Sequence, residues 1–216
     1  MPARRSKTGL TQQERRAAMR KRLLDATVDC LVRYGYTGTT TTRVTELAGV
    51  TRGAQVHHFP TRADLVAATV RHLAALRVSL ASDRVHAVRQ APDPLEAALD
   101  LLWEIHDGPV MWATMELWVA ARTDPGLREQ LVEAEPAARA ALLELAGTAF
   151  GAHADEPRLR HVMDTALDTA RGVRLLGLAD PDPAELTARW KRAKADLRLL
   201  VAAVAAQVPD RINGAR

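Results

Sequence analysis

A short polar segment in the first third of the chain carries the side chains best suited to recognise another molecule. Arg52 and Gln55 lie three positions apart, and four threonines at residues 39–42 precede them. An arginine guanidinium matches the two hydrogen-bond acceptors of guanine, and a glutamine carboxamide matches the acceptor and donor of adenine. The residue types and their spacing therefore predict a surface that reads the edges of base pairs.

Two short helices are predicted to position these side chains. Thr39 or Thr40 caps a helix of about eight residues that ends at Gly49, and Thr51 caps a second helix with the sequence RGAQVHHF. Two short helices joined by a tight glycine turn and packed on a longer helix form a helix-turn-helix. The side chains expected to face inward are Val44, Leu47, Ala48, Val56 and Phe59.

The second helix of such a motif enters the major groove with its N-terminal residues against the bases. Gly53 and Ala54 are small enough for the backbone to approach DNA closely, and Ala54 suits contact with a thymine methyl group. The hydroxyls of Thr40, Thr41 and Thr42 are expected to bind phosphate together with helix amides. Arg62, at the start of the next helix, is expected to add a phosphate contact.

The rest of the chain is patterned as helices. Thr11 and Glu14 form a capping box that begins a helix running to about Tyr34 and ending at Gly35. A helix capped by Thr61 should run from Arg62 towards Gln90, with further helices at about 94–107, 110–123, 126–150, 156–177 and 184–207. The core face of the first helix is expected to comprise Met19, Leu23, Ala26, Cys30 and Leu31. With strand signals nearly absent, the fold class is predicted to be all-α, with nine helices.

Charge is distributed unevenly along the chain. Residues 1–62 contain 12 Lys and Arg against 4 Asp and Glu, a net of +8, whereas the remainder is net negative and the whole chain is +4. A basic front end on an acidic body indicates that only the front end meets a polyanion. No apolar run approaches the roughly 20 residues of a membrane span, and the N-terminus has no secretory signal pattern, so a soluble cytoplasmic protein is expected. Cys30 is the single cysteine, which excludes an internal disulfide and favours a buried core position.

The segment YGYTGTTTTRVTELAGVTRGAQVHHFPTRADL resembles the DNA-binding domain of the tetracycline-repressor (TetR) family of bacterial regulators. The resemblance covers roughly residues 12–65. Its matching elements are Gly35-Tyr36, Ala48-Gly49-Val50, Thr51-x-Gly53, His58-Phe59, and Arg62 followed by Leu65. It implies a three-helix DNA-binding domain followed by a six-helix domain that binds a small molecule and dimerises. The predicted division is a flexible basic arm at 1–10, the helix-turn-helix domain at 11–61, and the second domain at 62–208.

Two positions depart from the common pattern of that family. Val56 stands where many members carry a tyrosine that touches phosphate, and Arg62 replaces a frequent lysine. By resemblance, His57 would then supply the contact to the DNA backbone from this part of the helix. The predicted DNA-contacting residues are Thr40, Thr41, Thr42, Thr51, Arg52, Gly53, Ala54, Gln55, His57 and Arg62.

The second domain contains a wall of large apolar side chains. Three of the four tryptophans and two methionines fall within residues 103–118, which suits either a hydrophobic core or a small-molecule pocket. The helix at about 110–121 is apolar nearly all round and is expected to be buried on every side. The predicted ligand-binding residues are Trp103, His106, Trp112, Met115, Glu116, Arg171 and Arg174.

The last two long helices are the predicted dimer interface, because the resemblance implies that they form a four-helix bundle with a second copy. One side of the final helix is apolar and needs burial, comprising Leu186, Trp190, Leu197, Leu200, Val201 and Val204. A two-fold dimer would set its two reading helices about 34–36 Å apart, or a multiple of that spacing. A pseudo-palindromic operator is therefore expected.

Two other classes of protein were weighed against this interpretation. An enzyme is not expected, because no two of the 7 histidines lie three or four residues apart and no GxSxG, CxxC or phosphate-binding glycine loop occurs. No cofactor and no metal are predicted. A basic adaptor for RNA or an acidic surface is the remaining alternative, although it would lack the helix-turn-helix punctuation. The predicted function is a ligand-responsive transcriptional regulator, by family expectation a repressor released from double-stranded DNA by a small molecule that the sequence does not identify.

Overall fold

The computed structural model describes residues 11–147, 156–179 and 182–207. Within these ranges the chain forms nine helices and no strand, which confirms the predicted all-α fold. The predicted arm at 1–10, the tail after residue 207 and the last residues of the predicted 126–150 helix lie outside the described residues. The helices are α1 (Gln12–Gly38), α2 (Thr41–Ala48), α3 (Arg52–His58), α4 (Arg62–Gln90), α5 (Pro94–Ile105), α6 (Pro109–Ala120), α7 (Pro125–Gly147), α8 (Pro157–Leu176) and α9 (Pro183–Ala205).

Hydroxyl caps begin each of the first four helices, as predicted. Thr11 and Glu14 form the capping box of α1, with the Glu14 N–H donating to Thr11 Oγ1 over 3.2 Å. Thr40 caps α2, Thr51 caps α3, and Thr61 caps α4. Each hydroxyl accepts from a backbone N–H that the helix itself leaves without a partner. These contacts are local, so the sequence alone locates the helix starts.

The first three helices share one small core, and we call α1–α3 the head. Val44, Ala48 and Phe59 pack on the inner face of α1, and the first turns of α4 complete the cluster with Leu65 and Ala68. Cys30 lies in this core, fully buried and with a free thiol. Its predicted position is therefore confirmed.

Three predicted inward positions in the head are wrong. Leu47 and Val56 are exposed, Val56 by 45%, and Met19 is only half-buried. Thr45 is buried in α2 instead, where its hydroxyl donates to the carbonyl of Thr42. Helices of seven and eight residues are too short for apolar spacing to define a unique buried face, so tertiary packing decides which side chains turn inward.

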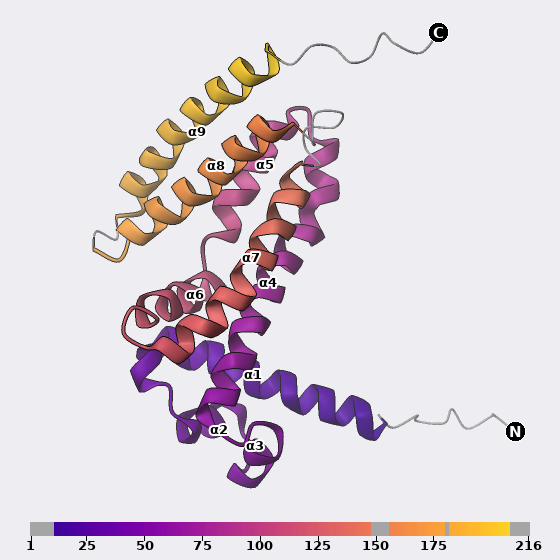
Figure 1. Cartoon of the computed structure of the whole chain (residues 1–216), viewed down its shortest axis with the longest axis vertical. Coiled ribbons are helices and arrows are strands. Elements are labelled where there is room, and N and C mark those ends of the chain that lie inside the picture. The colour runs from indigo at the N-terminus through magenta and orange to yellow at the C-terminus, as the bar shows by residue number, and fades with distance from the viewer. Residues whose placement is uncertain (1–10, 148–155, 180–181, 208–216) are drawn as a thin grey trace, which may run out of the picture.

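Helices α4–α9 form the second, larger part of the molecule, which we call the body. Figure 1 shows α4 rising from the head through the body, with α7 beside it and α5, α8 and α9 grouped at the far end. Contacts between α4 and α7 are the most extensive of any helix pair, followed by those between α1 and α6. Because α4 belongs to both cores and α6 packs on α1, head and body are joined at two places.

Helix α6 is less enclosed than its composition predicts. Its inner residues, including Met111 and Leu117, are buried, but Val119 is exposed and Trp112 and Trp118 are half-buried. The expectation that this helix is buried on every side is therefore wrong. Its outer face borders two hollows of the body surface.

The final helix buries most of its apolar side within one copy of the chain. Trp190, Leu197 and Val201 pack against α5 and α8, and Trp190 stacks on Trp103 with ring centroids 5.3 Å apart. Most of the burial that this side of the helix needs is thus supplied by α5 and α8 of the same copy. Exposed leucines nevertheless remain on both of the last two helices: Leu175 and Leu176 on α8, and Leu199 and Leu200 on α9.

Helix α4 is the one helix among the described residues whose length and composition would allow it to cross a membrane. The core helix of a soluble protein passes the same test, and 44% of the apolar window of α4 is buried inside the protein.

Candidate nucleic-acid interface and body cavities

The outer surface of α3 presents the candidate base-reading residues. Arg52 and His57 are exposed, and the guanidinium of Arg52 has no hydrogen bond or ion pair within the described part of the chain. Thr51, which caps the helix, is exposed as well. An unpaired guanidinium at the first position of a projecting helix is free to form the two parallel hydrogen bonds that guanine accepts.

Gln55 does not belong to this surface, and its predicted role as a base reader is wrong. Its side chain is only 2% exposed, and its Nε2 donates to the carbonyl of Phe59 over 2.5 Å. The carboxamide thus satisfies a carbonyl at the end of α3, where the helix leaves such groups without partners. The Gln55 side chain therefore forms its hydrogen bond inside the head and not with DNA.

Gly53 lies inside α3, where neither the backbone conformation nor the packing requires a glycine. A Cβ atom built at Gly53 would meet nothing closer than Thr51 Oγ1 at 3.9 Å, and its φ is not in the left-handed region. Glycine inside a helix costs about 1 kcal/mol relative to alanine. The chain itself therefore leaves space for a side chain at this position.

The first turn of α2 offers hydroxyls near the same side of the head. Thr40 and Thr42 are exposed and Thr41 is half-buried. The Thr40 hydroxyl accepts from the Arg43 N–H over 3.3 Å and keeps its own hydrogen to donate. Arg43 itself is tied to the protein, because its guanidinium donates to the Gly38 carbonyl and lies over the Tyr34 ring.

Arg62 is half-buried and is held by two backbone carbonyls of the protein. Its Nη2 donates to the Tyr36 carbonyl over 2.7 Å and its Nε to the Thr39 carbonyl over 3.0 Å. The guanidinium also lies over the Tyr36 ring, 4.4 Å from the centroid. These contacts give Arg62 a structural role that the sequence did not predict, because they brace the end of α1 against the start of α4.

Tyr36 stands at the centre of a junction between head and body. The helical course of α1 breaks at Gly35, whose φ of 67° is in the left-handed region, and a last turn then runs to Gly38. The Tyr36 N–H donates to Glu116 Oε1 of α6 over 2.7 Å, and its hydroxyl donates to Asp124 over 2.7 Å. We call Tyr36, Arg62, Glu116 and Asp124 the Tyr36 junction.

Glu116 therefore has a structural partner in α1, and it also lines a hollow of the body surface. Its carboxylate accepts the N–H that the break at Gly35 leaves free, and a Cβ at Gly35 would lie 2.8 Å from the same oxygen. The hydrogen bond to Tyr36 is the main cause that lowers the pKa of Asp124, while burial raises the pKa of the Tyr36 hydroxyl. Both pKa shifts keep the pair as carboxylate and phenol at neutral pH.

Basic residues of α1 flank α3, and the sequence patterns did not single them out. Arg20 lies over the Phe59 ring at 4.5 Å, and Arg22 Nη2 approaches the Gly49 carbonyl at 3.4 Å. Burial first, and then the charges of His57, Arg16 and Arg20, lower the pKa of His58. The only signal in the sequence was the excess of positive charge before residue 63.

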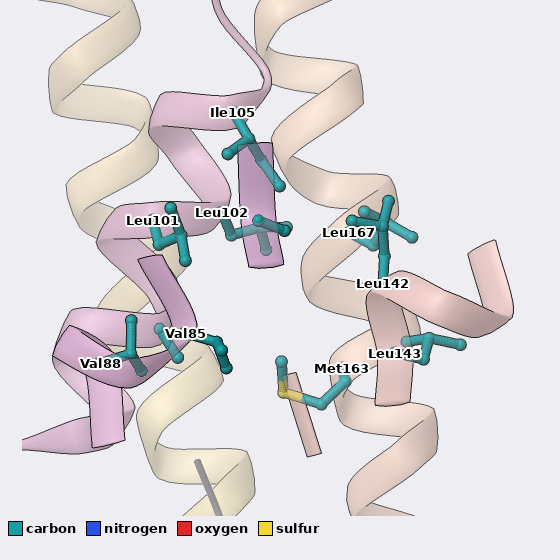
Figure 2. Close-up of a pocket in the computed structure, with 11 residues that line it drawn as sticks. Val85, Val88, Leu101, Leu102, Ile105, Leu142, Leu143, Met163 and Leu167 are labelled. Atoms are coloured by element: carbon teal, nitrogen blue, oxygen red, sulfur yellow. The ribbon is translucent and has the colours of Figure 1, made fainter. Parts of the chain in front are cut away.

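A narrow apolar cavity lies inside the body, between α4, α5, α7 and α8. Its volume is about 40 Å³, and Figure 2 shows aliphatic side chains and Met163 pointing into it from opposing helices. None of the predicted ligand-binding residues lines it. Ligand pockets typically begin at roughly 300 Å³, so this cavity would have to widen to enclose a drug-sized molecule.

A larger hollow of about 330 Å³ opens between α6 and α8. Met115, Trp118 and Val119 line it from α6, with Arg171 and Leu175 from α8. Two of these residues, Met115 and Arg171, were predicted to bind a ligand. Trp112 lines a separate hollow of about 210 Å³ near the Tyr36 junction, together with Met115 and Glu116.

Trp103 and Arg174 serve packing within the body. The Arg174 guanidinium lies 3.5 Å from the Trp103 ring centroid, its Nη2 donates to the Trp103 carbonyl, and its Nη1 pairs with Asp107 at 3.1 Å. With Trp190 on its other side, this stack joins α5, α8 and α9. Neither residue lines any of the hollows described above.

His106 is buried at the end of α5. Its Nδ1 lies 2.7 Å from the Leu102 carbonyl and must donate to it, because a carbonyl only accepts. Its Nε2 has no hydrogen-bond partner among the described residues. Burial is the main cause that lowers the pKa of His106 to about 4, and nearby arginine charges lower it further. The imidazole is neutral at physiological pH.

Comparison with known proteins identifies the head more directly than any single contact. Residues 23–69 match the sequence profile described as "Bacterial regulatory proteins, tetR family". This range covers α2 and α3, most of α1 and the first turns of α4, and thus the whole head core. Among the described residues, no group of three or more His, Cys, Asp or Glu side chains lies placed to hold a metal ion.

Relatives share mainly the N-terminal half of the chain. The uncharacterised HTH-type transcriptional regulator Rv2912c of Mycobacterium tuberculosis is 36% identical over 121 residues, 56% of this chain and 62% of the relative. The HTH-type transcriptional repressor Rv1474c of the same organism is 30% identical over 125 residues, 53% of this chain and 67% of the relative. The chain thus spans less than two thirds of the first relatives that it matches.

Similarity of fold extends further than similarity of sequence. The crystal structure of the multidrug binding protein EbrR complexed with ethidium covers 83% of this chain and 97% of its own, with a TM-score of 0.57 at 23% identity. At that identity the match concerns the arrangement of helices alone. Body and head together share the fold of that structure.

Proposed function

The chain belongs to the TetR family of bacterial transcriptional regulators, and from that premise we propose that it is a DNA-binding regulator whose affinity for an operator responds to a small molecule. The observation that carries the DNA-binding part is the outer face of α3. There an unpaired arginine, an exposed histidine and a glycine without an internal purpose lie together on a projecting helix. This combination suits insertion into a major groove.

The proposed DNA interface is smaller than the sequence predicted. It comprises the first turn of α3, with Arg52 as the reader of guanine and Gly53 and Ala54 permitting close approach. The hydroxyls of Thr40, Thr41, Thr42 and Thr51, together with His57, supply contacts to the phosphate backbone. Gln55 and Arg62 support these residues from within the protein. We also propose that the head ends within the first turns of α4, since Leu65 and Ala68 complete its core.

We propose that two copies associate through α8 and α9. The support is the exposed apolar surface on both helices, at Leu175, Leu176, Leu199 and Leu200. Two-fold symmetry would place two α3 helices on one face of DNA, which requires a pseudo-palindromic operator. Leu175 also lines the hollow between α6 and α8, so the proposed association and the proposed ligand site share α8.

The response to a ligand is proposed to pass through the Tyr36 junction. Helix α6 lines two hollows on its outer side and holds the end of α1 through Glu116. A ligand that binds better when α6 is displaced would also displace the head, and would weaken operator binding by its difference in affinity between the two states. The family expectation of repression makes release from the operator the proposed outcome.

The two other classes of protein differ from this proposal in measurable ways. As a family, such regulators act by binding and not by catalysis, and we extend this to the present chain together with a cytoplasmic location. A basic adaptor would bind RNA or acidic surfaces without preference for duplex sequence. Sequence-selective, salt-dependent binding to double-stranded DNA separates the three classes.

Selection of bound duplexes from a random pool is the experiment that tests the proposed function. We expect the purified chain to enrich a pseudo-palindrome, and metabolites screened against that duplex to include one that releases it. Binding that shows no sequence preference at physiological salt would overturn the regulator proposal. An enriched operator that no small molecule releases would leave DNA binding intact and overturn the response.

A further inference from the structure

Arg171 is a buried cation that lacks an adequate counter-charge. Its side chain is 14% exposed, and its Nε and Nη2 have no hydrogen-bond partner in the part of the chain that the structure describes. Asp168 Oδ1 is the nearest carboxylate oxygen, 3.7 Å from Nη1, which is too long for a hydrogen bond. A buried guanidinium in this state is costly, because neither its charge nor its donors are compensated.

The neighbouring carboxylates are already occupied by other arginines. Asp168 receives two hydrogen bonds from Arg139, over 2.9 and 3.1 Å. Glu135 is bound by Arg77 through two hydrogen bonds of 2.5 and 3.2 Å. Arg171 therefore shares a carboxylate that a better-placed arginine holds. Burial, and then the charge of Arg77, lower the pKa of the Arg171 guanidinium to about 10, which still leaves it a cation at neutral pH.

The side chain lines a hollow whose other lining residues are apolar, apart from Arg122 just after the end of α6. Arg171 lies over the Trp118 ring at 5.1 Å, and Met115, Val119 and Leu175 supply the remaining hydrophobic wall. Arg77 lies on the same ring at 5.7 Å, so Trp118 is held in place from within the body. At about 330 Å³ the hollow has the size of a small-molecule site without any widening.

We propose that the hollow between α6 and α8 binds an apolar carboxylate, with the acid on Arg171 and the hydrophobic part against Trp118 and Met115. This inference rests on the proposed function and assigns its effector a chemical class. A carboxylate accepts two parallel hydrogen bonds from one guanidinium. Nε and Nη2 have almost no accessible surface in the free chain, so the Arg171 side chain must turn towards the hollow for these donors to reach the acid. The same anion supplies the missing counter-charge, whereas a neutral analogue would fill the hollow and leave Arg171 uncompensated.

The test compares two probes that differ only in charge, 2-naphthoate and 2-naphthamide. Titration calorimetry on the full chain is expected to show at least tenfold tighter binding of the carboxylate. Arg171→Met, which keeps the length of the side chain and removes its charge, should abolish that preference while leaving 2-naphthamide within twofold. Arg89→Met, on an exposed arginine at the distant end of α4, is the matched control and should change neither affinity.

A second variant keeps the test decisive if Arg171→Met fails to fold. Arg171→Lys retains the charge without the two-donor fork and should bind 2-naphthoate with an affinity between those of the parent and the amide. Equal affinity for the two probes, no binding of either, or a preference that survives Arg171→Met would overturn the inference. Operator binding measured on the same preparations separates the two proposals. A selective operator released only by neutral compounds refutes the carboxylate alone, whereas carboxylate binding without sequence-selective DNA binding refutes the regulator.

Discussion

Arg52 is the residue on which recognition of the operator is expected to depend most. Arg52→Ala removes an exposed guanidinium that makes no hydrogen bond or ion pair with the described residues, so the fold should be unaffected. We expect a loss of about 1–3 kcal/mol in operator binding, with relaxed discrimination at one base pair. Competition between the operator and single-base variants measures both effects. Arg89→Ala removes an equal charge far from α3, and a similar loss in that variant would contradict base reading by Arg52.

Gly53 should show opposite effects on stability and on binding. Gly53→Ala adds a methyl group where the protein leaves open space and removes the conformational freedom of glycine in the unfolded chain. The free protein is expected to gain about 0.5–1 kcal/mol of stability while its operator affinity falls. Urea unfolding and operator titration together provide the check. An unchanged affinity would mean that the backbone of α3 does not approach DNA at this point.

His106 should make stability depend on pH in a defined window. Its pKa is about 4 in the folded chain against 6.5 as the ordinary value, so the unfolded state binds the additional proton as pH falls. The contribution of His106 to the free energy of unfolding is fully present above pH 6.5 and is lost as the pH falls towards 4. Between pH 7.5 and 5 the decrease is about 2 kcal/mol. Urea unfolding at both values should show a smaller decrease for His106→Gln, and an identical pH profile would refute the buried neutral imidazole.

The distinction between Arg52 and Gln55 marks the limit of what residue types alone predict. Both are polar residues on a short helix, and by type each is suited to a base edge. Burial separated them, because Gln55 is one helical turn before Phe59 and shares its inner face, whereas Val56 takes the outer position. From their residue types, Val56 was expected to face inward and Gln55 to face outward. Packing against α1 decided it, and such long-range contacts leave no local signal in the sequence.

Among the elements, α6 is the one whose role the sequence did not indicate. The order and approximate bounds of the helices were predictable, because threonine caps, glycine breaks and prolines act within a few residues of themselves. The contact of Glu116 with Tyr36 joins residues 80 positions apart. Because a contact over this distance leaves no signal in the sequence, the acidic residue on an apolar helix was interpreted as a ligand contact. The carboxylate instead supports a break in α1.

Removing this support should uncouple the ligand from the head. Glu116→Ala leaves the Tyr36 N–H without its acceptor and is expected to reduce the ratio of operator affinities measured without and with ligand. Glu116→Gln retains an oxygen acceptor and should preserve most of the coupling. A releasing compound found by screening is needed for this comparison. Full release in the alanine variant would show that the response takes another route, such as the direct connection through α4.

At the scale of the whole molecule, the number of copies decides whether one operator can be bound by two heads. Sedimentation at micromolar concentration is expected to show a dimer. Leu176→Glu combined with Leu199→Glu should produce monomers whose operator affinity is at least a hundredfold weaker, because each copy then binds one half-site alone. Leu80→Glu alters an exposed leucine on α4 and serves as control. A monomeric parent, or dimers that survive both charges, would exclude α8 and α9 as the interface.

The lone thiol at the centre of the head gives the molecule an internal reporter. Cys30 is fully sealed between α1, α2 and α4, and burial raises its pKa, so the nucleophilic thiolate is scarce as well as shielded. Alkylating reagents therefore reach the sulfur only during transient opening of the three-helix unit. The rate at which the unaltered protein is alkylated thus reports how often the head opens. A ligand that acts by destabilising the head would accelerate alkylation. A ligand that rotates the head as a rigid body would leave the rate unchanged.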